Sequence, residues 1–120
     1  MSATGVRKAA TKILEGLDKG LLGARVDSGN CVYRKRLEDG SCKFCGLGYL
    51  LPPEALDVLE ATGKLGASAY ALYSTLPDVM KELDMSCVEV SAFQRAHDSW
   101  ATRDSSIETF RYFLQSAQRI

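Results

Sequence analysis

Three cysteines close together and one distant histidine are the side chains of this chain best suited to metal binding or catalysis. Cys42 and Cys45 form a Cys-x2-Cys pair, and Cys31 precedes that pair. Thiolate sulfur and imidazole nitrogen are preferred zinc ligands, and a hairpin can bring these three thiols together. The fourth ligand would be His97, the single histidine, or Cys87. The spacing therefore raises the hypothesis of a zinc site made of Cys31, Cys42, Cys45 and His97.

The same residues allow two other interpretations. In the first, Cys31 and Cys45 are simply core residues of a hairpin, because free cysteine is among the most buried residue types. Alternatively, either thiol is a nucleophile and His97 its base. Because successive helical residues point about 100° apart, we expect Asp98 to be poorly placed to orient the His97 ring. We therefore expect no enzyme.

A basic run follows the first of these cysteines. Tyr33, Arg34, Lys35 and Arg36 lie at the expected hairpin tip, where cationic side chains and a neighbouring aromatic ring can contact an acidic protein surface. The sequence predicts that these four residues form an exposed partner-binding site. The nearby Gly46-Leu47-Gly48 lacks the remaining residues of a phosphate-binding loop, so we expect no nucleotide there.

Length and charge restrict the class of protein. The chain has 120 residues, which is the size of one domain, with 15 basic and 15 acidic side chains and a net charge of zero. Nine of the basic residues fall in residues 1–45, against five acidic ones. A protein that binds nucleic acid strongly usually has a basic excess over the whole domain, so such a partner is not expected. Neither a signal peptide nor a membrane span is recognisable, and we expect a cytoplasmic protein.

Hydrophobic periodicity and breaker residues give the elements. Ser86 and Glu89 match a capping box, Asp39-Gly40 is typical of a hairpin turn, and Pro77 must interrupt any helix that contains it. The expected elements are a helix over 5–22, a hairpin over 31–48, and helices over 53–62, 65–84 with a break at Pro77, 87–101 and 105–118.

These elements predict one domain, 1–120, of the α+β class. The fold would be mainly helical, with a two-stranded β-hairpin packed on four to five α-helices, because an isolated hairpin is marginally stable. So many amphipathic segments can expose more apolar surface than one small domain covers. A homodimer is therefore one expectation.

Two blocks of the chain resemble a family of small proteins from bacteriophage and bacterial genomes. The first block runs from Cys31-Val32-Tyr33-Arg34 through Gly40 to the segment at 45–54, and the second is Phe93-Gln94-Arg95-Ala96-His97-Asp98. The family pattern matches Cys31 and Cys45, whereas Cys42 is additional. The resemblance implies a phage-related origin, in which small proteins of the host cytoplasm bind and block a host enzyme or a defence complex.

The function expected from the sequence is therefore non-catalytic. The protein would bind and modulate or inhibit a host or defence protein through the basic hairpin tip. A zinc-stapled domain that contacts nucleic acid and a Cys/His-dependent enzyme are the two alternatives. The expectation requires no cofactor, although zinc would be bound in the first alternative.

Overall fold

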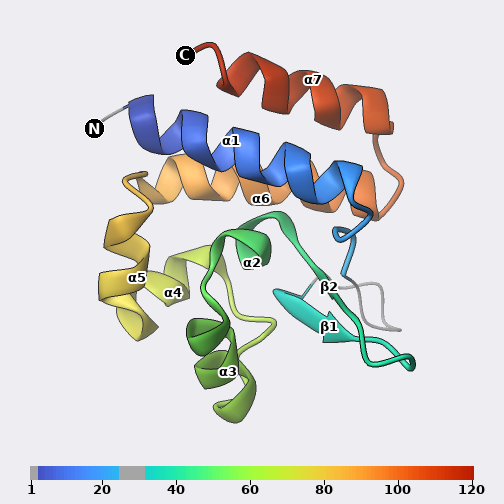
Figure 1. Cartoon of the computed structure of the whole chain (residues 1–120). Helices are drawn as coiled ribbons and strands as arrows, with labels where there is room; N and C mark the ends of the chain where they lie inside the picture. Colours follow the sequence, from blue (N-terminus) through green and yellow to red (C-terminus); the bar gives the residue numbers. More distant parts are fainter. Residues whose placement is uncertain (1–2, 25–31) are drawn as a thin grey trace.

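The computed structural model describes residues 3–24 and 32–120. Within these ranges the chain forms seven helices and one two-stranded antiparallel sheet (Figure 1). The mainly helical α+β class predicted from the sequence is confirmed. The elements in chain order are α1 (Ala3–Asp18), β1 (Arg34–Arg36), β2 (Cys42–Phe44), α2 (Gly46–Leu50), α3 (Pro53–Ala61), α4 (Ala69–Thr75), α5 (Pro77–Glu82), α6 (Cys87–Ala101) and α7 (Ile107–Ala117).

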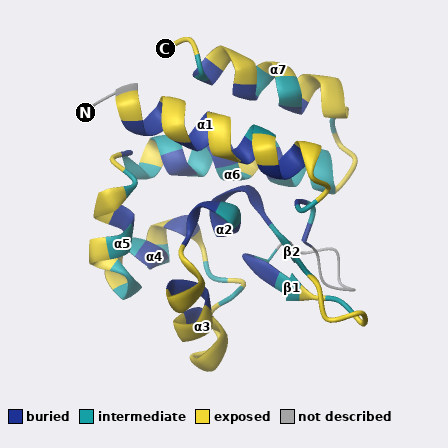
Figure 2. Cartoon of the chain, in the orientation of Figure 1, coloured by how far each residue is buried: buried dark blue, intermediate teal, exposed yellow. Residues whose placement is uncertain are grey.

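The long helices α1 and α6 pack against a short buried helix, α2, and α7 packs on their other side. α1 packs against α7 and α2, while α6 packs against α4, α2 and α7 (Figure 1). Helix α2 lies inside this arrangement, and Figure 2 shows it among the buried parts of the chain. The hairpin and α3 lie on the other side of α2, away from α7. None of the helices in the described ranges has the length and apolar character needed to cross a membrane.

The first helix ends earlier than the expected residue 22. Gly20 adopts φ +71°, and its N–H donates to Leu17 while that of Leu21 donates to the Gly16 carbonyl. This is a Schellman arrangement, which a glycine in the left-handed region permits. Leu21 then accepts from the Phe44 N–H, and Leu22 bridges to Phe44. The apolar pattern thus continues past the helix because these leucines cover the edge of the hairpin.

The hairpin is shorter than the predicted 31–48. Arg34 pairs with Phe44 and Arg36 with Cys42, and the expected turn is present with Gly40 at φ +87°. Residues 46–48 belong to helix α2 and not to a strand, so that part of the prediction is wrong. A Cβ at Gly48 would lie 1.9 Å from the Tyr33 carbonyl oxygen. Glycine therefore allows a close backbone approach here.

The remaining helices follow the sequence signals closely. α3 and α6 occupy almost the predicted ranges, and the capping box between Ser86 and Glu89 is formed. Pro77 divides the predicted 65–84 helix into α4 and α5, and α4 begins only after the Ser68 cap. This division and the additional α2 raise the number of helices above the expected four to five. α7 is capped by Ser106, one residue after the expected start, because its hydroxyl accepts from the Thr109 N–H.

Candidate functional site

His97 is completely buried and both of its ring nitrogens have partners. It lies on α6 with 0% of its surface exposed. Its Nε2 accepts a hydrogen bond from the Gly23 N–H at 3.1 Å, and its Nδ1 lies 3.0 Å from Oδ1 of Asp98. Because Nε2 is an acceptor, the hydrogen is assigned to Nδ1, which donates to the carboxylate. This arrangement holds a neutral imidazole in one orientation.

The expectation that Asp98 could not orient this ring is wrong. Although Asp98 follows His97 directly on α6, its carboxylate bends back to reach Nδ1. The Gln94 side-chain amide also donates to the same Oδ1 at 3.3 Å, one helical turn earlier. The rotation of about 100° between successive helical residues therefore does not prevent a flexible aspartate side chain from reaching the ring of the residue before it. In the enzyme alternative, His97 would be a base and would need a free Nε2. In the structure this nitrogen accepts the Gly23 N–H.

Aromatic rings enclose the histidine on its other sides. The ring centroid of His97 lies 5.7 Å from that of Trp100 and 6.0 Å from that of Phe110, both in edge-to-face geometry. Trp100 and Phe110 stack on each other at 5.4 Å. Such pairs stabilise a core beyond the area that they bury. The histidine joins α6 to α7 and, through Gly23, to the segment that follows α1.

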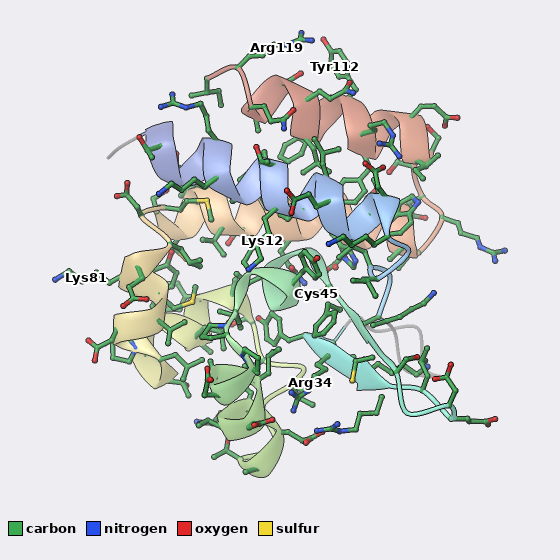
Figure 3. The ribbon with its side chains drawn as sticks, viewed as in Figure 1. Lys12, Arg34, Cys45, Lys81, Tyr112 and Arg119 are labelled. Atoms are coloured by element: carbon green, nitrogen blue, oxygen red, sulfur yellow. The ribbon has the colours of Figure 1, made fainter. Side chains whose placement is uncertain are left out.

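Cys45 is also completely buried, at the junction of β2 and α2. Its Sγ accepts the Gly48 N–H at 3.2 Å and so caps α2 (Figure 3 labels this residue). Burial raises the pKa of the thiol to about 12, although the hydrogen bonds from Gly48 and Gln94 lower it in part. The thiol is therefore protonated at neutral pH. In this structure the enclosed thiol is part of the core and caps a helix, and a raised pKa lowers the share of the nucleophilic thiolate.

Of the other cysteines, the described Cys42 and Cys87 do not gather around Cys45 and His97. Cys42 lies half-buried on β2 opposite Arg36, and Cys87 begins α6. Over residues 3–24 and 32–120, no three histidine, cysteine or acidic side chains are placed to hold a metal ion. Cys31, the remaining member of the proposed zinc site, lies outside the described residues. The zinc hypothesis thus has no ligand cluster among the residues that can be inspected.

The predicted partner-binding residues divide into two groups. Tyr33 is 2% exposed and Arg34 8% exposed, so the expectation that they form an exposed contact is wrong. The Tyr33 hydroxyl donates to the Ala67 carbonyl, and its backbone N–H donates to that of Leu65. Burial is the main cause that raises the pKa of the Tyr33 phenol, and the nearby Cys45 and Asp98 raise it further. Tyr33 therefore attaches the hairpin to the loop between α3 and α4.

Arg34 attaches the hairpin to α3. Its Nη2 donates to Asp57 at 2.8 Å and to Glu60 at 3.3 Å, and Figure 3 shows Arg34 between β1 and α3. Its Nε is buried without a partner among the described atoms. Arg36 donates to both carboxylate oxygens of Glu60, each at 3.2 Å. The Arg36 hydrogen bond, then the charges of Arg36 and Arg34, lower the pKa of Glu60.

The sequence reasoning missed the acidic partners of these arginines. Asp57 and Glu60 are three residues apart on the predicted 53–62 helix, so they share one face of it. That spacing was the available signal, since two acids on one face can receive a basic strand. We call Arg34, Arg36, Asp57 and Glu60 the Arg34 network.

Two lysines remain on the opposite face of the hairpin. Lys35 and Lys43 are direct cross-strand partners, and both are half-buried. Directly opposed residues in an antiparallel pair point to the same face, so the two ammonium groups share one side of the ribbon. No ion pair among the described residues includes either lysine. We call this pair the lysine face.

Comparison of the chain with known proteins does not supply a family. No family model, no curated protein and no solved structure matches it. Function must therefore be inferred from the geometry alone.

Proposed function

We propose that this protein acts by binding another protein without catalysis, and that the lysine face is the contact. The observation that carries the proposal is the cross-strand pairing of Lys35 with Lys43 on a hairpin whose other face is attached to the body of the molecule. Of the four contact residues predicted from the sequence, the proposal keeps Lys35 and leaves out Tyr33, Arg34 and Arg36. It adds Lys43, which was not predicted.

Placement of the reactive groups supports a non-catalytic role. The His97 ring and the Cys45 thiol lie inside the core, and their hydrogen-bonding atoms face protein partners. A substrate would have to displace these partners before either group could react. A binding function needs no such rearrangement.

Attachment of the hairpin makes the lysine face a preorganised surface. Arg34 joins β1 to α3, and Tyr33 joins it to the 64–67 turn. A short two-stranded hairpin alone is marginally stable, so these attachments hold the lysine face in one orientation. Preorganisation of this kind reduces the entropy lost when a partner binds.

Charge indicates the chemistry of the partner. Like charges directly opposite each other in a sheet are unfavourable, and an anionic surface placed over them would relieve the repulsion. The ordered backbone and the neutral whole-chain charge favour a carboxylate-bearing protein over a nucleic acid. The resemblance to small phage and bacterial proteins makes a bacterial enzyme or defence complex in the host cytoplasm the partner class to test, with inhibition as the expected effect.

The first experiment uses defined polyanions. The isotopically labelled protein is titrated with poly-L-glutamate and, separately, with a DNA duplex at the same ionic strength, and amide chemical shifts are recorded. We expect poly-L-glutamate to move the signals of residues 35 and 43 most. Lys35→Gln with Lys43→Gln should abolish these shifts, whereas Lys64→Gln with Lys81→Gln, which removes two exposed lysines elsewhere, should retain them.

Specific binding is then tested in bacterial lysate. We expect a captured protein that is lost with Lys35→Glu and Lys43→Glu and retained with Lys64→Glu and Lys81→Glu. Tighter binding of the DNA duplex at the same two residues would replace the protein partner by a nucleic acid. Equal effects of the two lysine pairs would refute the lysine face as a contact.

A further inference from the structure

Helix α6 presents an outward ridge that no other described element covers. Its buried side is formed by Val90, Phe93 and His97. Val88 and Arg95 lie opposite that side, two turns apart, and Val88 is 74% exposed. The small residues Ser91 and Ala92 lie between them. We call Val88, Ser91, Ala92 and Arg95 the α6 ridge.

A hollow lies on each side of this ridge. The α4-side hollow has a volume of about 380 Å³ and is lined by Ala69 and by Cys87, Val88, Ser91, Gln94 and Arg95 of α6. The α7-side hollow has a volume of about 330 Å³, and its walls are almost entirely apolar. Its lining includes Ala92 and Phe93 of α6, and Phe113, Ala117 and Ile120 on the α7 side. Glu89 is its one charged residue.

Large apolar side chains border the same surface. Val88 stands on the ridge, and Ile120 lines the α7-side hollow. Their exposed fractions are 74% and 63%. Scattered exposed apolar residues are ordinary, but two beside one helix face and its hollows form a patch that association would remove from water.

We propose that the α6 ridge is a homodimer interface, in which two copies of the chain pack their α6 helices antiparallel about a twofold axis. An interface between identical copies must carry both protruding and receiving features on one patch. Here Val88 protrudes beside the α4-side hollow, and the small Ser91 and Ala92 at the centre let two helices approach closely.

Charge distribution specifies the antiparallel direction. With the axis between Ser91 and Ala92, Arg95 of one copy lies opposite Val88 of the other and next to its Glu89. The arginine stem can then cover Val88 while the guanidinium reaches the carboxylate. Among the described residues, Arg95 forms no ion pair within its own chain. A parallel pairing would place the two arginines together, which is unfavourable.

The molecule is large enough for such an interface. Its principal extents are 36 × 32 × 21 Å. A stable interface buries about 800 Å² on each partner, which a face of these dimensions accommodates. The lysine face lies on the hairpin and not on α6, so the dimer does not depend on the function proposed above.

The test is the molar mass in solution. Sedimentation equilibrium of the full chain in reductant should show a monomer–dimer equilibrium. Val88→Glu should raise the dimer dissociation constant by at least about tenfold, because it places a carboxylate in the apolar centre of the contact. Arg95→Glu should weaken the dimer as well. Tyr112→Glu on α7, which changes a side chain that is 70% exposed away from the hollows, should leave it unchanged.

Circular dichroism of each variant checks that the fold is retained, since Val88 and Arg95 point outward. A wild-type protein that stays monomeric at every concentration would overturn the proposal. So would a dimer that Val88→Glu leaves intact or that Tyr112→Glu weakens equally. Capture of a different protein by a monomeric chain, with loss on Val88→Glu, would assign the ridge to a heterologous partner.

Discussion

Arg34 and His97 are the two buried polar residues in the described core, and the protein accommodates them in different ways. His97 is neutral in its hydrogen-bonding arrangement and is enclosed by aromatic rings, with a partner for each nitrogen. Arg34 is a charged group covered on most sides, whose acidic partners Asp57 and Glu60 remain 64% and 42% exposed. Water therefore reaches the two carboxylates of the Arg34 network and does not reach His97.

This difference between His97 and Arg34 shows where a neutral and a charged polar side chain can each be buried. A neutral donor–acceptor pair costs little once both atoms are bonded, so His97 can lie at the centre of the helices. A guanidinium loses much more hydration, so Arg34 lies between a hairpin and a surface helix, where carboxylates can stay solvated. We expect the two sites to respond differently to mutation, pH and salt.

Loss of His97 should have the largest effect. His97→Ala removes a buried ring and leaves the Gly23 N–H and Asp98 without their partner, which should cost about 3–4 kcal/mol in the free energy of unfolding. His97→Phe keeps the ring volume but not the acceptor and should cost about 1–3 kcal/mol. Urea denaturation measures both. If His97→Phe were as stable as the wild type, packing alone would explain the burial of this residue.

Alkaline pH should destabilise the His97 side of the molecule through Cys45. The pKa of Cys45 is raised in the folded state, to about 12, so above its ordinary value of 9.0 the unfolded state loses a proton that the folded state keeps. Stability must then fall as the pH rises between these values, by up to about 1.4 kcal/mol per pH unit for this thiol. Cys45→Ala should reduce that slope. Equal slopes for the wild type and Cys45→Ala would show that the thiol ionises equally in both states.

Mutations in the Arg34 network should depend on which partner is removed. Arg34→Met leaves two carboxylates that water can solvate, and we expect a loss of about 1–2 kcal/mol. Asp57→Asn with Glu60→Gln leaves the buried guanidinium without an anion and should destabilise more than Arg34→Met. Thermal unfolding at low and high salt compares the variants. The reverse order would mean that the guanidinium is hydrated in the folded protein.

Acid should produce the smallest change. The pKa of Glu60 is lowered, chiefly by Arg36, so its contribution to stability is complete above its ordinary value and disappears as the pH falls through the lowered one. Arg36→Gln should flatten this part of the stability profile, which chemical denaturation at a series of acidic pH values would reveal. Because both side chains are exposed, we also expect added salt to reduce the effect. An unchanged profile in Arg36→Gln would assign the effect to another carboxylate.

Local signals in the sequence were sufficient for most of the helices. The Ser86–Glu89 capping box, the apolar period of the 87–101 helix and Pro77 predicted boundaries that the structure shares. These features act within a few residues of the backbone, so they can be recognised without the rest of the fold. The short helix α2 was missed because its five residues carry no period and form a helix only when enclosed.

The candidate site could be predicted only in part. The sequence indicated that Cys45 and His97 belong to one region, but whether they react or pack depends on burial and on bonds from Gly23, which lies 74 residues from His97. Likewise, the basic run was visible in the sequence, while its division into buried Arg34 and the lysine face required the register with β2.

By itself, the sequence determined the fold class, the helix boundaries marked by the Ser86–Glu89 capping box and Pro77, and the presence of a basic hairpin, because propensity, capping and periodicity are local properties. Only the tertiary structure decided which polar side chains are enclosed and which are available. The accessibility of a side chain depends on residues distant in the chain, such as Asp57 for Arg34 and Gly23 for His97. Whether the electrostatic cost of burying a polar side chain is compensated therefore depends on contacts with residues distant in the sequence. Local residue spacing does not reveal these contacts.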